Sequence, residues 1–161
     1  MKTAFIVLFI LIVLLLTFRS IPKVVNAMGL AGGVLSKCPN KPNCVCSEYK
    51  KDANHFIDPI IIPKNNTVDT FSILKNIIQE MGGDVQVESD NYLAATFTST
   101  LFKFTDDLEI RMDSTRKVIH IRSASRVGYS DMGVNKKRSQ SLKKLFNNKV
   151  AAANKSMQLA P

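Results

Sequence analysis

Two neighbouring stretches of the sequence, residues 101–113 and 118–125, alternate apolar and polar side chains with the two-residue period of a β-strand. The apolar side chains of both strands must lie on the same face of a sheet, which restricts how the strands can pair. A two-residue turn places Asp107 opposite Arg122, and a four-residue turn places Glu109 opposite Arg122. A three-residue loop would turn one apolar set to the wrong face. Both allowed registers therefore predict a cross-strand ion pair at Arg122.

Two helices and a hairpin complete the predicted domain. Apolar residues recur at helical spacing over 68–81, with Thr67 as the N-cap and Asp69 in the first turn, and again over 134–150. Between the first helix and the strand at 101, two short alternating runs around a Ser-Asp-Asn turn predict a hairpin. We expect an α+β domain over residues 38–150, built of a helix, a four-stranded antiparallel sheet and a helix.

The first quarter of the chain has a different character. Residues 4–18 form an unbroken apolar run that would rise about 22 Å as a helix, against about 30 Å for the hydrocarbon layer. We expect residues 1–27 to be an uncleaved membrane anchor, with cleavage near Ala27 as the alternative that releases a secreted or periplasmic domain. Residues 28–37 are predicted to be a tether, and residues 151–161, which lack a pattern, a disordered tail.

Residues 37–63 combine three cysteines with four prolines, a composition typical of a loop that needs fastening. In an oxidising compartment Cys38 and Cys44 can close a small ring, although spacing alone leaves a bridge to Cys46 open. The cysteines and the signal-like start place the domain on the non-cytoplasmic side of a membrane. With His55 the spacing is C-x5-C-x-C-x8-H, which does not match paired zinc knuckles, so we expect neither a metal nor a cofactor.

The positive charge is concentrated towards the C-terminus. Residues 114–161 hold eleven lysines and arginines against one acidic residue, Asp131, whereas the whole chain carries +9. Such a surface suits an anionic ligand or a lipid head group, or it is a solvated helix face. Aromatic residues are not interleaved with the basic ones, which argues against nucleic acid.

The segment 122–138, RSASRVGYSDMGVNKKR, joins the last predicted strand to the last helix and is the best candidate for function. Its arginines can grip a carboxylate or phosphate beside the N–H groups that begin the helix. A structural interpretation is equally coherent, because Asp131 can cap the helix and an Arg-Asp-Asn network can lock strand to helix. The candidate ligand-binding residues are Arg122, Arg126, Tyr129, Asp131, Asn135 and Arg138.

Three motifs, CPNKPNCVCS, LFKFTDDLEIRMD and VIHIRSASRVGYSDMGVNKKR, together resemble an uncharacterised bacterial and plant family, the domain of unknown function 1499. The resemblance covers residues 38–147. It implies an exported or lumenal α+β domain and implies no reaction. It also implies a disulfide, because Cys38 and Cys44 match the family's paired cysteines, while Cys46 stands where the family more often has serine.

These features predict a non-enzymatic envelope module that binds an anionic ligand, a lipid or a protein partner through the 122–138 surface. The sequence contains no P-loop, GxSxG, HExxH or dinucleotide-binding motif. The alternative is an enzyme of unknown reaction that uses the same polar cluster or Cys46.

Overall fold

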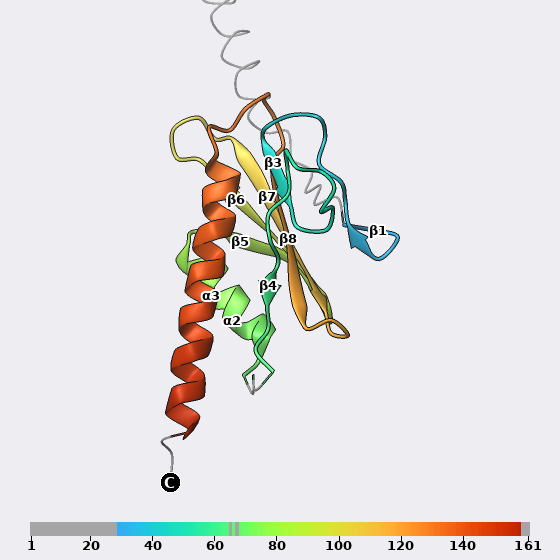
Figure 1. The fold of residues 1–161 in the computed structure, drawn as a ribbon. Coiled ribbons are helices and arrows are strands. Elements are labelled where there is room, and N and C mark those ends of the chain that lie inside the picture. Colours follow the sequence, from blue (N-terminus) through green and yellow to red (C-terminus); the bar gives the residue numbers. More distant parts are fainter. Residues whose placement is uncertain (1–28, 65, 67, 159–161) are drawn as a thin grey trace, which may run out of the picture.

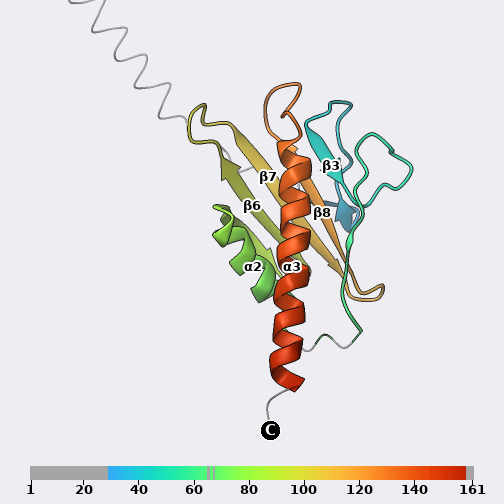
Figure 2. The same ribbon diagram turned by 60° about the vertical axis from the view of Figure 1, so that its left-hand side comes forward.

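The computed structural model describes residues 29–64, 66 and 68–158 (Figure 1). Their centre is a six-stranded antiparallel sheet with the strand order β3-β8-β7-β6-β5, in which β4 pairs with the same edge of β8 as β3. The strands are β3 (Cys44–Cys46), β4 (Ile60–Ile61), β5 (Asp84–Ser89), β6 (Tyr92–Thr98), β7 (Thr105–Asp113) and β8 (Val118–Ser125). Helices α2 (Thr70–Glu80) and α3 (Val134–Gln158) cover one face, as Figures 1 and 2 show.

The main core lies between the sheet and the two helices. Most apolar residues of the alternating strands face the helices and are buried, as the pattern predicted, whereas Val85 and Met112 are partly buried and Val87 is exposed. Burying each such side chain is worth about 1.5–3 kcal/mol. The largest members of this core are Ile60, Leu74, Ile77, Ile78, Leu93, Leu108, Ile110, Ile119, Ile121, Leu142 and Phe146.

The register between β7 and β8 is the one that a four-residue turn produces. Ile110 pairs with Ile121 and Glu109 pairs with Arg122. Strand β8 has the predicted bounds. Strand β7 begins at Thr105 rather than at the predicted position 101, because residues 99–104 close a loop in which the backbone N–H of Ser99 donates to the carbonyl of Phe104.

The predicted four-stranded sheet is wrong in the number of strands. Strands β3 and β4 lie inside the stretch that was predicted to be a Cys/Pro-rich loop. They contain three and two residues, too few to show an alternating pattern. The long edge of β8 supplies the hydrogen-bonding partners that make them strands.

The helix ends also differ from the prediction. Helix α2 begins at Thr70, and Asp69 is its N-cap, accepting hydrogen bonds from the backbone N–H groups of Phe71 (3.0 Å) and Ser72 (3.3 Å). Thr67, the predicted cap, lies outside the described residues. Helix α3 continues to Gln158, so residues 151–158 are helical where a disordered tail was predicted. The alanines at 151–153 are strong helix formers and extend it beyond the packed face.

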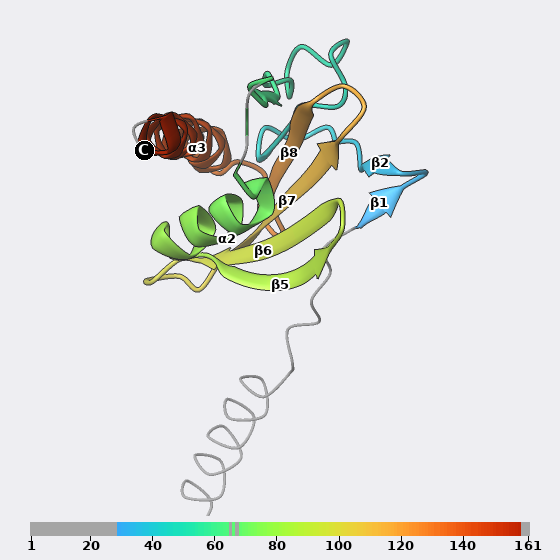
Figure 3. The same cartoon turned by 90° about the horizontal axis from the view of Figure 1, so that it is seen from below.

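The second face of the sheet is covered by residues 29–37, the N-terminal segment. Its hairpin consists of β1 (Leu30–Ala31) and β2 (Val34–Leu35), and the side chain of Leu35 is fully buried. Figure 3 shows strands β1 and β2 on the side of the sheet opposite to α2 and α3. Residues 29–37 thus belong to the domain and are not the predicted tether. The predicted membrane anchor and the cleavage position at Ala27 lie outside the described residues. Within the described ranges, no helix combines the length and apolar character needed to cross a membrane.

Candidate functional site

The sheet face that lies under the N-terminal segment carries buried charges. Strand alternation places Glu109 and Arg122 on this face, and their side chains are 0% and 4% exposed. Glu109 accepts hydrogen bonds from Arg122 Nη1 (2.7 Å), Tyr92 Oη (2.7 Å) and the backbone N–H of Gly29 (3.1 Å). Burial, together with the bond to Glu109, raises the pKa of Tyr92. The hydrogen bonds compensate the cost of burying the Glu109 carboxylate.

A second ion pair lies further along the same face. Arg111 donates to both carboxylate oxygens of Glu48, from Nε at 2.6 Å and from Nη2 at 3.2 Å. His120 lies beside this pair, with Nδ1 3.2 Å from Ser47 Oγ and 3.6 Å from Glu48 Oε2. Burial lowers the pKa of His120 despite the nearby carboxylate. The polar face predicted from alternation is therefore an interior layer rather than a solvated surface.

Two arginines of the 122–138 segment are held by the two adjacent aspartates of β7. Arg126 makes a bidentate pair with Asp107, at 2.9 Å from Nε and 2.7 Å from Nη2, and this pairing raises the pKa of Arg126. Arg138 donates from Nη2 to Asp106 at 2.8 Å, and its guanidinium stacks 4.4 Å above the ring of Phe97. Both guanidinium groups therefore have structural partners.

The remaining polar residues of the segment lock β8 to the start of α3. Asn135 is buried, accepts a hydrogen bond from Ser123 Oγ (2.6 Å) and donates to the carbonyl of Asn43 (3.1 Å). Asp131 accepts from the backbone N–H groups of Gly133 (3.0 Å) and Asn135 (2.7 Å), and so caps the helix. The Arg-Asp-Asn network expected from the structural interpretation is present. Tyr129 stands apart from it and is 71% exposed.

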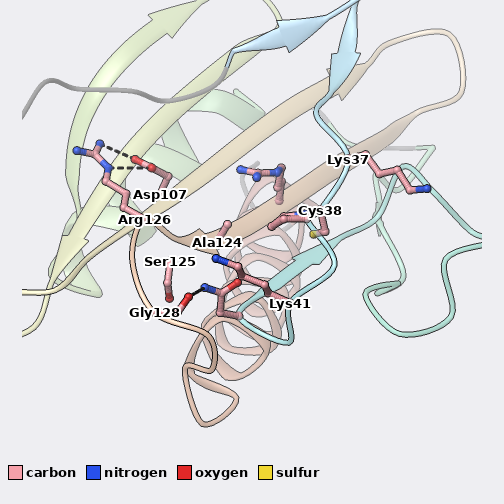
Figure 4. A pocket seen from close by; sticks show the side chains of 11 residues that line it. Lys37, Cys38, Lys41, Asp107, Ala124, Ser125, Arg126 and Gly128 are labelled. Atoms are coloured by element: carbon pink, nitrogen blue, oxygen red, sulfur yellow. Dashed lines mark hydrogen bonds and ion pairs between the residues drawn. The ribbon is translucent and has the colours of Figure 1, made fainter.

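A cleft of about 450 Å³ opens between the end of β8 and the loop that holds the first two cysteines (Figure 4). A disulfide joins Cys38 to Cys44, as the family resemblance implied, and Cys46 is a buried free thiol. The polar and charged residues on the cleft wall are Lys37, Lys41, Asn43, Asp107, Arg122, Ser125 and Arg126. The structure thus brings two of the predicted site residues, Arg122 and Arg126, to one cavity.

Sequence reasoning missed the other side of this cleft. Lys37, Lys41 and Asn43 are about 80 residues distant from Arg122 in the sequence, so no local pattern connects them. Both lysines are exposed, and neither has an ion-pair partner in the part of the chain that the structure describes. The available signal was the motif CPNKPNC, which was interpreted only as a loop that needs fastening.

Thiol and metal chemistry find little support in the geometry. Burial raises the pKa of Cys46 to about 11, so its thiol is protonated at neutral pH and is a poor nucleophile. Cys38 and Cys44 are joined to each other, and His55 contacts Asp52 and the carbonyl of Lys41. Among the described residues no group of three His, Cys, Asp or Glu side chains is placed to hold a metal ion.

The model of the family described as "Protein of unknown function (DUF1499)" matches residues 34–146, which is more than half of the chain. The chain belongs to this family. The DUF1499 match begins at the first residue of β2 and ends in α3, so it includes the whole six-stranded sheet, the disulfide and the cleft. No curated protein matches the chain.

Proposed function

We propose that this DUF1499 protein is a non-enzymatic binding module that takes a phosphate or carboxylate group into the cleft between Lys37, Lys41 and Arg122. In this proposal the domain lies on the non-cytoplasmic side of a membrane, held by residues 4–18 or released by cleavage near Ala27. The supporting observation is the charge of the cleft wall, on which the two lysines have no acidic partner among the described residues.

The charge balance of the cleft favours an anion. The carboxylate on its wall, Asp107, is engaged by the bidentate bond from Arg126, and Arg122 is balanced by Glu109 behind it. The positive charges of Lys37 and Lys41 are left over. A cleft with surplus charge of one sign raises the local concentration of oppositely charged ligands.

Arg122 and Asn43 on the cleft wall each have hydrogen-bonding capacity that the described residues leave unused. Arg122 Nε and Asn43 Oδ1 are buried and have no hydrogen-bond partner in the described part of the chain. A buried donor or acceptor without a partner costs about 1–3 kcal/mol. Both atoms have almost no accessible surface, so a ligand would reach them only if these side chains turned towards the cleft.

The alternative of an enzyme that uses Cys46 or the 122–138 cluster is weaker. The Cys46 thiol is 2% exposed, and Arg126 and Arg138 are both held in structural pairs. On the cleft wall, the Asp107 carboxylate is engaged by Arg126, and the Ser125 hydroxyl accepts a hydrogen bond from Asn135 Nδ2. Binding therefore uses the residues as they lie, whereas catalysis would require them to leave their partners.

Thermal unfolding in the presence of inorganic phosphate tests the proposal. We expect phosphate to raise the melting temperature, and the variant Lys37→Gln/Lys41→Gln to weaken binding about tenfold, since losing charge-assisted hydrogen bonds costs about 1.5–3 kcal/mol. The matched control is Lys144→Gln/Lys155→Gln, which removes the same charge from exposed positions on α3. Binding that is absent, or that both double variants weaken equally, would refute a specific site.

A further inference from the structure

The exposed large apolar side chains of the described residues are concentrated in one part of the molecule. Six of the nine largest exposures lie in two loops, 99–104 and 126–133. The side chain of Met132 is 91% exposed and that of Leu101 80%. We name as the apolar tip the residues Leu101, Phe102, Phe104, Val127, Tyr129 and Met132. A cluster of this kind on an otherwise ordinary surface marks an interaction site.

The two loops leave the sheet side by side. Thr98 pairs with Thr105 at the end of β6 and β7, and Asp106 pairs with Ser125 at the end of β8. The backbone N–H of Arg126 donates to the carbonyl of Thr105 at 3.1 Å, which joins the base of one loop to the base of the other. Figures 1 and 2 show both loops at the same end of the molecule, beside the N-terminus of α3.

Each loop is fixed by its own hydrogen bonds. In the first, the backbone N–H of Phe104 donates to Ser99 Oγ at 2.9 Å, and the rings of Phe102 and Phe104 stack at 5.6 Å. Lys103 has φ +56°, and Met132 in the second loop has φ +54°, a backbone region that residues other than glycine rarely adopt. In the second loop the backbone N–H of Met132 donates to Ser130 Oγ at 3.3 Å.

Basic side chains surround the apolar tip. Lys136 and Lys137 are exposed in the first turn of α3, where the helix dipole disfavours cations and where the helix has no acidic residue. Lys103 lies between Phe102 and Phe104 in the first loop. The neighbouring aspartates, Asp106 and Asp107, are neutralised by Arg138 and Arg126. This end of the molecule therefore combines an apolar cluster with a positive balance of charge, in which Lys103, Lys136 and Lys137 outweigh Asp131.

We propose that the apolar tip inserts into the interfacial layer of an anionic lipid bilayer, with the lysines at its margin contacting the lipid head groups. Aromatic rings and a methionine suit the boundary between head groups and acyl chains, and lysines near such a surface are attracted by anionic lipids. We propose a membrane rather than a protein as the partner because an anionic bilayer has an apolar interior for the tip and a negatively charged surface for the lysines. A bilayer also needs no surface whose shape matches the tip.

The length of the N-terminal chain agrees with this orientation. If residues 4–18 lie in a membrane, the ten residues 19–28 let Gly29 lie at most about 35 Å from it. Gly29 is bonded to Glu109, which lies four residues, or about 13 Å, from the end of β7 that carries the tip. The tip can therefore reach the same bilayer without unfolding the domain.

The full chain contains no tryptophan, which makes a single introduced tryptophan a clean reporter. The variant Phe102→Trp is reconstituted in vesicles of phosphatidylcholine, with or without phosphatidylglycerol, and quenched with doxyl-labelled lipid. We expect its emission to shift to shorter wavelength and to be quenched in the anionic vesicles. The matched control Ile61→Trp, exposed on β4 at the opposite end of β8, should remain water-exposed in both.

Charge variants separate this proposal from the cleft. In the Phe102→Trp background, Lys136→Gln/Lys137→Gln should raise the content of anionic lipid needed for quenching, whereas Lys144→Gln/Lys155→Gln should not. Lys37→Gln/Lys41→Gln should weaken phosphate binding about tenfold and leave lipid quenching in place, so either proposal can fail alone.

Three results would overturn membrane insertion by the tip. The first is Phe102→Trp emission that remains accessible to aqueous acrylamide in anionic vesicles. The second is a Phe102→Trp side chain that is protected from acrylamide only at a high ratio of protein to lipid and is not quenched by doxyl-labelled lipid. This result would indicate contact with a second copy of the chain. The third is equal lipid quenching of Phe102→Trp and Ile61→Trp, since a general collapse of the domain onto the bilayer would produce it.

Discussion

Glu109 Oε2 and Arg122 Nη1 lie 2.7 Å apart on neighbouring strands, and both side chains are buried under the N-terminal segment. Their pairing follows from the register of β7 and β8, in which Glu109 lies directly opposite Arg122. A residue that looked like a ligand-binding arginine is thus held first as a structural group. It contributes to the cleft through its position on the wall.

Removing the charge of Glu109 should strongly destabilise the domain. Glu109→Gln leaves the buried Arg122 guanidinium without its counter-ion, a change that costs about 3–5 kcal/mol. Urea unfolding followed by circular dichroism measures the loss. Glu88→Gln is the control, because Glu88 forms an exposed pair with Lys75 that is worth at most about 1 kcal/mol. Equal losses in the two variants would contradict a special role for the buried pair.

The double variant Glu109→Leu/Arg122→Met separates the value of the pair from the cost of breaking it. Replacing both charges of a buried pair by apolar groups is often neutral or stabilising. We expect the double variant to unfold at a higher urea concentration than Glu109→Gln. A double variant as unstable as the single one would show that the lost contacts of Glu109 with Tyr92 and Gly29 dominate.

Arg138 should matter for folding more than its neighbours on the same turn. Arg138→Gln removes the bond to Asp106 and the stacking on Phe97, and we expect a loss of about 2–3 kcal/mol in the free energy of unfolding. Lys137→Gln, at an exposed position, should change stability by no more than about 0.5 kcal/mol. An Arg138→Gln variant as stable as Lys137→Gln would free Arg138 for ligand binding and refute the lock between β7 and α3.

The cysteines make a prediction that mass spectrometry can test. Alkylation of the unreduced protein should modify one cysteine, Cys46, and only after denaturation, because burial shields it and raises its pKa to about 11. Reduction before denaturation should expose all three. Cys38→Ser/Cys44→Ser should lower the free energy of unfolding by about 2 kcal/mol, the entropic effect expected of so small a ring. Rapid alkylation of the native, unreduced protein would contradict the buried position of Cys46.

His120 should make stability depend on pH. Its folded-state pKa is lowered by burial, so below about pH 6.5 the unfolded chain binds a proton that the folded chain does not. Stability therefore falls as pH decreases through this range, although Glu48 and Asp113 oppose the effect and Arg111 reinforces it. His120→Gln should flatten the profile between pH 7 and pH 5.5 in denaturation experiments. An unchanged slope in this variant would assign the pH dependence to other groups.

The fold could be predicted from the sequence wherever the pattern was long. The eight residues of β8 and the alternation of β7 were enough to limit the register to two choices. The turn of residues 114–117 then decided between them, and its geometry depends on a bond from the backbone N–H of Arg116 to the Asp113 carboxylate that alternation does not reveal. Strands β3 and β4 were missed because they are short and are strands only through their hydrogen bonds to the edge of β8.

The candidate site was predicted only on one side. The composition of the 122–138 segment identified it as a candidate. Its capping aspartate and its Arg-Asp-Asn network were predicted from the sequence and are present in the structure. The opposing wall comes from the disulfide loop, and the hydrogen bond from Asn43 Nδ2 to the carbonyl of Gly128 at 2.9 Å joins positions 85 residues apart. Contacts between residues so far apart in the sequence produce no local pattern from which they could be predicted.

By itself the sequence determined the α+β class, the family resemblance, the two apolar faces that pack against helices, and the concentration of positive charge near the C-terminus. These properties depend on periodicity and composition, which are local. The tertiary structure decided which charges are free. It buries Glu109 and Arg122 together, engages Arg126 and Arg138 with the aspartates of β7, and leaves Lys37 and Lys41 at the cleft. The physical reason is that desolvation and pairing depend on which segments cover one another, and only the folded chain fixes that.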